Sequence, residues 1–449
     1  MKNTILTVVA TFVLSLPAAG QQQATTPSGE VLTLERALSL ALEHNRGLRI
    51  AQIDTAKAQD QIDAMRTRRL PKNSVSILGS QLLNKFSFEF EQGVFGTYPG
   101  IGPVPATNTK ITTPRRPSVY ALANVSQPLS QLYQINLNIR QAELAKQAEE
   151  EELRQQRHEL IQRVRGIYYS ALDAEATLTA SRDAIAFYKE MDRLTAQLLA
   201  EEAALKSENL DVRARLAQEE YNALTQENRL AQLKEQLNVE LGRDVSMDFR
   251  LAPVPGVSTF ESNLAAAREQ AVAQRPELRS AHLKVQQAEQ DRKIKRADYI
   301  PEVSLAFNYI SPFNIEVLPK NIASIGLQLT WEPWDWGRRK RELQEKSRAT
   351  EQAEIAARET EARILIEVSQ AHRKLREARA LLGVVNATQE SAQEKLRVAK
   401  NRFAEKAVLY KDVLQAQNES AQALKSYQQA VLAYWSARAD FEKAIGEGQ

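Results

Sequence analysis

The chain carries one pattern twice, and this duplication constrains the fold more than any other feature of the sequence. The segment Asn-Arg-Gly-Leu-Arg at residues 45–49 recurs as Arg-Pro-Glu-Leu-Arg at residues 275–279, and Pro71 lies opposite Pro301, a shift of 230 positions. Matches kept in one frame over so long a stretch indicate two structural repeats. Six further identical pairs share the shift: Leu34 and Leu264, Ala37 and Ala267, Ala41 and Ala271, Ala51 and Ala281, Arg66 and Arg296, and Ser74 and Ser304.

After this stretch the order of features recurs with small changes of register, as loops of unequal length would cause. A proline-rich segment at residues 251–258 separates the two copies and suits neither helix nor sheet. We therefore predict a first repeat at residues 21–250, a linker at 251–260 and a second repeat at 261–449, each with a helix, two strands and a long helical hairpin. The later matching segments are Val125–Pro128 with Leu329–Pro333, Asp211-Val212 with Asp412-Val413, and Leu241-Gly242 with Ile445-Gly446.

The first residues have the pattern of a secretory signal. Lys2 is the positive flank, Ile5–Leu16 is the apolar stretch, and the small residues Ala18-Ala19-Gly20 suit cleavage. The apolar run is shorter than the ~20 residues that a spanning helix needs, which disfavours the alternative of a short membrane anchor. We expect residues 1–20 to be removed. No later segment approaches the length of a spanning helix, so a membrane would have to be crossed by β-strands.

Composition excludes several classes of function. Lys and Arg number 59 against 56 Asp and Glu, a formal charge of +3 with both signs interspersed, which argues against nucleic-acid binding. Cysteine is absent, and no phosphate-binding glycine loop, nucleophile elbow or zinc-helix motif occurs. The sequence therefore predicts neither an enzyme nor a cofactor or metal site. The histidines lack ligand-like spacing along predicted helices: His44, His158, His282 and His372.

The helical parts have heptad spacing on more than one side. In the last helix, apolar and small residues from Leu409 to Phe441 alternate steps of four and three, and a second seam runs beside them from Leu414 to Trp435. Two seams give each helix two neighbours, as in a wall of helices. In the first half, a turn near residues 204–208 would leave a helix of roughly 70 residues, about 100 Å long, and a return helix of roughly 35. An ordinary soluble coiled coil is the alternative.

Between the helices lie four segments that alternate with period two. The first is irregular, because Val75 and Ile77 share one parity and Phe86, Phe88 and Phe90 the other, which suggests a bulge or a register change between them. Pro71 and Pro301 precede the first strand of each half, and Pro128 and Pro333 follow the second, where helix must become strand. The other apolar sets are Val119, Ala121, Ala123 and Val125; Val303, Leu305, Phe307 and Tyr309; and Ile325, Leu327, Leu329 and Trp331.

Segments of this kind suit membrane strands, with Trp331, Trp334 and Trp336 at the periplasmic headgroup level; core packing is the alternative for these tryptophans. Four strands alone leave two unpaired edges in lipid, at several kcal/mol per bare backbone group. Because bacterial barrels begin at about eight strands, two or more copies must share one, and three copies give twelve. The glycine- and proline-rich residues 91–117 suit a long extracellular connection, with residues 311–320 as the shorter counterpart.

Three segments, in this order and with the duplicated layout, resemble the TolC family of outer-membrane efflux proteins over nearly the whole mature chain. They are Leu-Thr-Leu-Glu-Arg-Ala-Leu at residues 32–38, Trp-Asp-Trp-Gly-Arg-Arg at 334–339 and Asp-Val-Leu-Gln-Ala-Gln at 412–417. The resemblance implies a mainly α fold with a small transmembrane β-barrel part. Long antiparallel coiled-coil helices would form an α-barrel, and four strands per protomer would complete a homotrimeric 12-stranded barrel.

The resemblance also implies a function. The chain would be the outer-membrane channel of a tripartite efflux or export system, with a large periplasmic portion. It would be a passive conduit that works with a periplasmic adaptor protein and an inner-membrane pump. The alternative, a soluble periplasmic coiled-coil scaffold or adaptor, explains the helices but not four strands with apolar faces.

By the same resemblance, the turns between the long helices form the periplasmic entrance, with Asp211 and Asp412 near it. A ring of these carboxylates would concentrate cations and close a constriction through ion pairs with Lys206, Arg402 or Lys406. The alternative is that each aspartate stabilises the positive N-terminal end of its helix. The family usually has a glycine at each turn, whereas Leu205 and Lys406 stand there in this chain.

Overall fold

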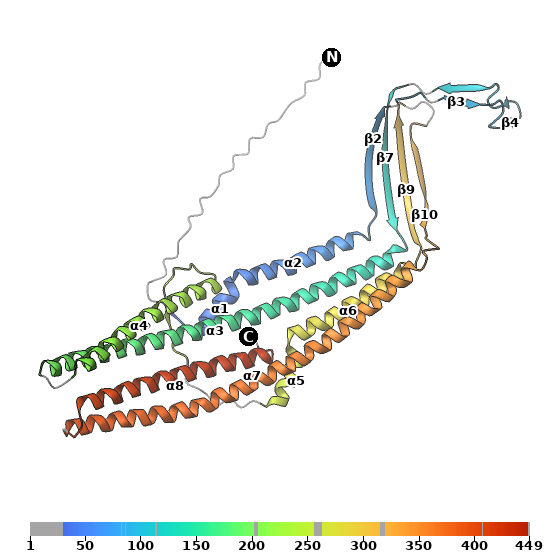
Figure 1. Ribbon diagram of the computed structural model, residues 1–449. Helices are drawn as coiled ribbons and strands as arrows, with labels where there is room; N and C mark the ends of the chain where they lie inside the picture. Colours follow the sequence, from blue (N-terminus) through green and yellow to red (C-terminus); the bar gives the residue numbers. More distant parts are fainter. Residues whose placement is uncertain are drawn as a thin grey trace, which may run out of the picture.

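The computed structural model describes residues 30–81, 83–85, 87–112, 115–201, 205–255, 263–314, 319–405 and 407–447. The predicted signal at residues 1–20, Phe86 and Lys406 lie outside these ranges, as does part of the predicted linker. Long helices run side by side through most of the molecule, and a narrow sheet continues from one end of them after a bend (Figure 1). The prediction of a mainly helical fold with a small β part is confirmed.

Each half of the chain has the same order of principal elements. The first half contains β1 (Val31–Leu32), α1 (Leu34–His44), α2 (Arg46–Thr67), β2 (Lys72–Gln81), β7 (Pro117–Pro128), α3 (Gln131–Ala200), α4 (Lys206–Glu240) and β8 (Arg250–Leu251). The second half contains α5 (Leu264–Gln274), α6 (Pro276–Ala297), β9 (Glu302–Phe313), β10 (Ile322–Thr330), α7 (Arg338–Ala404) and α8 (Tyr410–Ala444).

The long helical hairpins have the predicted lengths. Helix α3 has 70 residues and α4 has 35, and the second hairpin repeats this with 67 and 35 residues in α7 and α8. Helix α3 ends at Ala200 and α4 begins at Lys206, slightly before the bounds that the predicted turn at 204–208 implies. Within the described ranges, no α-helix combines the length and the hydrophobicity of a membrane-spanning segment.

The sheet and the helices share one lateral order. The four long strands form an antiparallel sheet in the order β10-β9-β7-β2. The helices joined to them follow the same order, because α7 contacts α6, α6 contacts α3 and α3 contacts α2. Farther from the sheet, α8 and α4 take the places of α6 and α2, with α8 packed against both α3 and α7. The protomer is therefore a ribbon four elements wide along most of its length.

The predicted bulge or register change in the first strand is wrong, since β2 pairs with β7 in one register from Lys72 to Gln81. Strand β2 ends at Gln81, and Phe88 and Phe90 belong to a separate strand, β3 (Ser87–Phe90), which pairs with β6 (Thr109–Thr112). Asn84 and Lys85 stand between the two strands, and asparagine favours turns over strands. The alternation of Phe88 and Phe90 therefore reflects their place in another sheet and not a change within β2. The connection predicted at residues 91–117 also contains a short pair, β4 (Thr97–Tyr98) with β5 (Gly102–Pro103).

Two hydrophobic cores hold the helical part together. The first core packs α1, α3 and α4 around the β1–β8 pair and also includes Leu432 and Ala439 of α8, and the second packs α5, α7 and α8. Beside each core, one side chain joins the start of the helix that leads to the sheet, α2 or α6, to the end of the return helix, α4 or α8. In the first joint, the Asn45 side-chain amide donates to the backbone oxygen of Glu240 at 2.9 Å. In the second joint, the Arg275 guanidinium donates to the backbone oxygens of Lys443 and Ala444 at 3.2 and 3.3 Å.

Candidate functional site

Over the half nearest the helices, the long sheet has one apolar and one polar face, whereas farther out the second face is also apolar, with Leu122, Ile310 and Ile322 in one row. Directly opposed residues point to the same face, and the register places Ile325, Phe307 and Val125 in one row. The row beside it on the other face is Ser324, Asn308, Asn124 and Ser74, where the side chains of Asn124 and Asn308 lie 2.5 Å apart. The apolar face is open: the exposed fractions are 71% for Ile325, 72% for Leu327, 76% for Val75 and 73% for Ile77.

Both outer strands of this sheet have an unpaired edge. Within the described part of the chain, β2 pairs only with β7, and β10 pairs only with β9. Each edge presents a row of backbone amide and carbonyl groups ready to pair with another chain. A sheet with an open apolar face and two open edges is incomplete as a single copy in water.

The three predicted interface tryptophans lie just beyond the end of β10. Trp331 follows the strand directly, and Trp334 and Trp336 stand in the segment that leads to α7. Their exposed fractions are 59%, 72% and 91%, and the rings of Trp334 and Trp336 meet edge to face with centroids 6.1 Å apart. Core packing within the protomer, the alternative explanation for these residues, is therefore excluded.

The four predicted junction prolines lie between helices and strands. Pro71 and Pro301 directly precede β2 and β9, Pro128 is the last residue of β7, and Pro333 lies between β10 and α7. Ser130 connects the junctions of the two halves. Its hydroxyl donates to the backbone oxygen of Pro301 at 2.7 Å and accepts from the backbone amide of Val303 at 2.8 Å.

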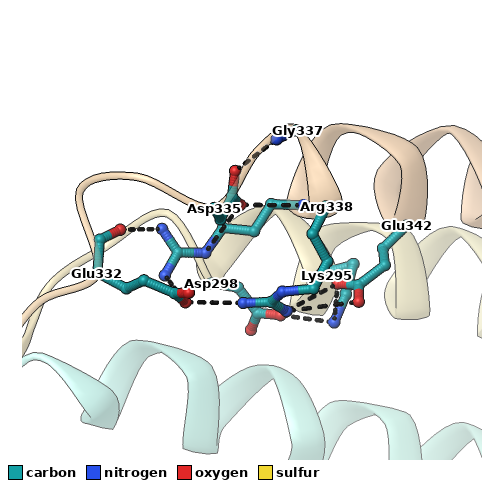
Figure 2. A network of polar contacts seen from close by, with 8 residues as sticks. Lys295, Asp298, Glu332, Asp335, Gly337, Arg338 and Glu342 are labelled. Atoms are coloured by element: carbon teal, nitrogen blue, oxygen red, sulfur yellow. Dashed lines mark hydrogen bonds and ion pairs between the residues drawn. The ribbon is translucent and has the colours of Figure 1, made fainter.

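The segment between β10 and α7 is held by Asp335. Its carboxylate accepts hydrogen bonds from the backbone amides of Gly337 and Arg339, both at 3.0 Å, and so caps the start of α7 (Figure 2). These bonds, that from Arg339 first, lower the pKa of Asp335. Gly337 has a φ of +85°, a left-handed conformation that glycine adopts without steric cost.

A wider ion-pair network joins this segment to α6. Glu332 pairs with Arg338 at 2.7 Å and with Arg339 at 3.1 Å. Lys295 of α6 pairs with Asp298 at 2.8 Å and with Glu342 of α7 at 2.9 Å (Figure 2). Hydrogen bonds from the Lys295 ammonium to Asp298 and Glu342 raise its pKa. Sequence reasoning missed these partners, because they meet only when two helices far apart in the chain pack side by side.

At the opposite end of the molecule, those predicted gate residues that the structure describes do not pair with one another within one protomer. Asp211 lies exposed in the second turn of α4, and the Asp412 carboxylate accepts from the backbone amide of Leu409 at 3.0 Å. The latter contact is the helix-stabilising role that was the alternative for Asp412. In the described part of the protomer, neither aspartate forms an ion pair with Lys206 or Arg402. Leu205 is exposed beside the first turn.

The first hairpin has a polar lock near its turn that the sequence did not suggest. The buried Asn209 side chain donates to the Asp192 carboxylate at 2.9 Å and to the Thr195 hydroxyl at 3.0 Å. Arg213 donates to the same Asp192 oxygen at 3.0 Å. A buried asparagine in a helix otherwise rich in polar residues gives no signal in a one-dimensional pattern. The only related feature of the sequence is that Asn209 lies shortly before the duplicated Asp-Val pair.

The sequence matches the family model described as outer membrane efflux protein over residues 37–243 and 267–447. No curated protein matches the sequence. Three solved structures share the fold at low sequence identity. The Campylobacter jejuni CmeC outer membrane channel has a TM-score of 0.76 at 18% identity, covering 92% of this chain and 86% of that chain. The Neisseria gonorrhoeae MtrE outer membrane channel, in its open state, has 0.73 at 17%, covering 92% and 89%. The outer membrane protein VceC from Vibrio cholerae has 0.71 at 16%, covering 92% and 96%.

Proposed function

Because the chain belongs to the outer membrane efflux protein family, we propose that it is the outer-membrane channel of an efflux or export system. It acts as a passive conduit from the periplasm to the exterior, with its long helices in the periplasm. The observation that carries the proposal is the sheet, whose apolar face and two edges are open in the single copy.

Three copies would satisfy all the open groups of this sheet. Strand β10 of one protomer would pair with β2 of the next, and twelve strands would close a barrel with no edge left in lipid. The face of Ile325 and Leu327 would meet the acyl chains, and the face of Ser324 and Asn308 would line the water-filled pore. Trp331, Trp334 and Trp336 would lie at the periplasmic headgroups, where amphipathic rings are favoured.

The same proposal assigns the remaining parts of the chain. Residues 21–250 and 261–449 form two structural repeats joined by the linker at 251–260. The turns at the far end of the helices form the periplasmic entrance and meet an adaptor protein, which connects the channel to an inner-membrane pump. The protein supplies a path and no catalysis, since the pump provides the energy.

A pair of variants on neighbouring β10 residues tests the proposal. Leu327→Lys places a charge on the apolar face, at a cost of about 2–4 kcal/mol per copy if that face meets lipid. Gln328→Lys places the same charge on the polar face and serves as the matched control. We expect Leu327→Lys to be lost from washed outer membranes. Gln328→Lys should be recovered there as a trimer that conducts ions in a planar bilayer, with reduced cation preference.

Two results contradict this assignment. One is recovery of the wild-type protein as a monomer in the soluble periplasm, which would support a scaffold or adaptor role. The other is equal tolerance of lysine at positions 327 and 328.

Asp211 and Asp412 form the proposed entrance ring, with Lys206, Arg402 and Lys406 as their partners. Asparagine at both positions removes the charge and keeps an oxygen that accepts hydrogen bonds at a helix start. The double variant Asp211→Asn/Asp412→Asn should lower cation preference and raise the open fraction in single-channel recordings. Unchanged closure and unchanged cation preference would leave only the helix-stabilising role.

A further inference from the structure

The two halves of the protomer place their strands and helices at the same two offsets along the chain. Helix α2 and strand β2 begin 230 positions before α6 and β9. In the hairpins of the sheet, Lys72 lies opposite Ser126 and Glu302 lies opposite Thr330, so the second strands β7 and β10 match at an offset of 204. The ends of α3 and α7 and the starts of α4 and α8 are also 204 positions apart. One unit, a strand hairpin with its helices, therefore occurs twice with the same internal register.

The two units meet inside the protomer at what we call the inner junction, formed by β7 with β9 and by α3 with α6 and α8. Its strands have a single register, in which Val125 lies opposite Phe307 and Ser126 lies opposite Ala306. The inner junction is complete in one copy. The two flanks of the protomer are the outer sides of the same units: β10 and α7 on one flank, and β2, α2 and α4 on the other.

The α7 flank has the apolar surface expected of a helix that packs against another chain. Four of its apolar side chains are between 47% and 63% exposed, and each lies 204 positions after an α3 residue that stands beside α6 or α8 at the inner junction. The pairs are Ile355 with Glu151, Ile366 with Gln162, Leu381 with Thr177 and Val384 with Ala180. The side of α3 that is covered within the protomer thus corresponds to the side of α7 that is open.

We propose that the next copy of the chain covers these flanks by repeating the inner junction, an inference that rests on the proposed function and fixes the residues that meet. The two offsets convert the β7–β9 register into a register between β10 and β2 of the next copy. Thr330 then lies opposite Ser76 of the next copy, and Leu329 lies opposite Ile77 of the next copy.

This register keeps each face of the sheet uniform across the boundary between copies. Leu329 and Ile77, which are 63% and 73% exposed in the single copy, meet on the apolar face, and Thr330 and Ser76 meet on the polar face. A shift by one residue would place the apolar side chains of one strand beside the polar side chains of the other. Shifts by two or four residues keep the faces and are the alternatives to exclude.

The helices beside these strands acquire charged pairs by the same conversion. Three polar contacts of 2.9–3.2 Å join the start of α3 to α6 and β9 at the inner junction. Their counterparts across the flanks are Arg341 with Asp60, Asp335 with Lys72 and Arg338 with Arg68, the second residue of each pair belonging to the next copy. Two of these pairs join opposite charges. In the like-charged pair, Arg338 is already neutralised within its own copy by Glu332 at 2.7 Å and Glu342 at 3.4 Å.

The test uses pairs of introduced cysteines, since the chain has no cysteine of its own. Thr330→Cys is combined in turn with Ser74→Cys, Ser76→Cys or Ser80→Cys, a matched series of serines on the polar face of β2. Directly opposed residues have Cα atoms about 4.5–5.5 Å apart, which a disulfide spans, whereas residues two positions out of register are about 7–8 Å apart, which it does not.

Mild oxidation of outer membranes should join copies through Ser76→Cys with about tenfold the yield of the other two variants and give a covalent trimer on non-reducing denaturing gels. Thr330→Cys with Glu302→Cys is the control, because these positions are opposed within one protomer. It should lose its free thiols without joining copies.

Preferential cross-linking through Ser74→Cys or Ser80→Cys overturns the repeated junction, and so does the absence of cross-linking in all three variants when the control loses its thiols. Conductance in planar bilayers separates this failure from that of the proposed function. A protein that conducts but does not cross-link through Ser76→Cys remains a channel whose copies meet in another register. A protein that stays monomeric and does not conduct loses both assignments.

Discussion

The two joints of the helical part perform one task with different chemistry. In the first, Asn45 is a neutral cap that accepts from the backbone amide of Leu48 and donates to Glu240. In the second, Arg275 is 4% exposed and also pairs with Glu277 and Glu367 at 2.9 and 2.8 Å. Duplication has therefore kept the backbone geometry while the side chains that hold it diverged, and the energetic consequences of the same substitution should differ between the halves.

A glycine with left-handed φ ends the return helix at each joint, and the two glycines differ in the space around them. Gly242 has a φ of +69°, and a Cβ there would lie 2.4 Å from the backbone oxygen of His44. Gly446 has a φ of +84°, and its Cβ would lie 3.0 Å from the Cβ of Gln274. A contact of 2.4 Å with a backbone oxygen requires a large shift of the chain, whereas a contact of 3.0 Å with a Cβ requires a shift of only a few tenths of an ångström.

Substitution of these two glycines by alanine should have the largest effect on the unfolding free energy, and the effect should differ between the two joints. We expect Gly242→Ala to cost about 4 kcal/mol, from left-handed strain plus overpacking, and Gly446→Ala about 2 kcal/mol. Thermal and urea unfolding of the detergent-solubilised protein measure the difference. Gly383→Ala is the control, since this helical glycine has no neighbour within 4 Å of its Cβ position and should be stabilised by up to about 1 kcal/mol. A larger loss at Gly446 than at Gly242 would contradict the geometry.

The contrast between a shared backbone geometry and diverged side chains also explains which parts of the structure the sequence could predict. The pairing of Leu241-Gly242 with Ile445-Gly446 and of Pro71 with Pro301 is local and repeated, so it gave the repeat layout, the long hairpins and the places where helix becomes strand. The assignment of Phe88 to the first strand failed because parity alone does not say which partner a strand chooses.

The sequence pattern could not predict contacts between segments that lie far apart in the chain. Asn45 and Glu240 are 195 positions apart, and Arg275 reaches Ala444 across 169. The lock around Asn209 and the ion pairs of Lys295 likewise depend on helix packing.

Truncation of Asn45 and Arg275 should show a smaller difference in unfolding free energy between the two joints. Arg275→Ala leaves two backbone oxygens without their donor and two partly exposed carboxylates without their cation, and we expect a loss of about 3 kcal/mol. Asn45→Ala removes a neutral cap and should cost about 1–2 kcal/mol. Urea unfolding of both variants gives the two losses. Arg348→Ala, at an exposed position of α7, should stay within about 0.5 kcal/mol of wild type. Equal losses of unfolding free energy for the two variants would show that Arg275 stabilises its joint no more than Asn45 does.

The smallest expected effect on the unfolding free energy lies in the cores. Tyr168 and His372 are 204 positions apart, the same separation as Leu241 and Ile445, and so occupy matching positions in the two halves. The Tyr168 hydroxyl lies 2.9 Å from the backbone oxygen of Leu32 and 2.7 Å from that of Ala252, so it ties the β1–β8 pair to α3. His372 instead packs against the ring of Phe441, with centroids 5.9 Å apart. Tyr168→Phe should therefore cost about 1–2 kcal/mol at pH 8, from the loss of a buried hydrogen bond.

This hydroxyl also gives the first core a pH dependence. Burial raises the pKa of Tyr168 to about 12, whereas a tyrosine in the unfolded chain ionises near 10. Between these values the folded state holds a proton that the unfolded state has lost, so the unfolding free energy must fall as pH rises. Tyr168→Phe has no phenol at this position, so its unfolding free energy does not fall in this way. The difference in unfolding free energy between wild type and Tyr168→Phe should therefore narrow from pH 10 to 12 in urea unfolding. Burial also raises the pKa of Tyr169, which leaves a residual slope in both proteins. Tyr221→Phe, at an exposed tyrosine of α4, should keep the wild-type curve, and a gap for Tyr168→Phe that stays constant up to pH 12 would show that the phenol does not hold its proton in the fold.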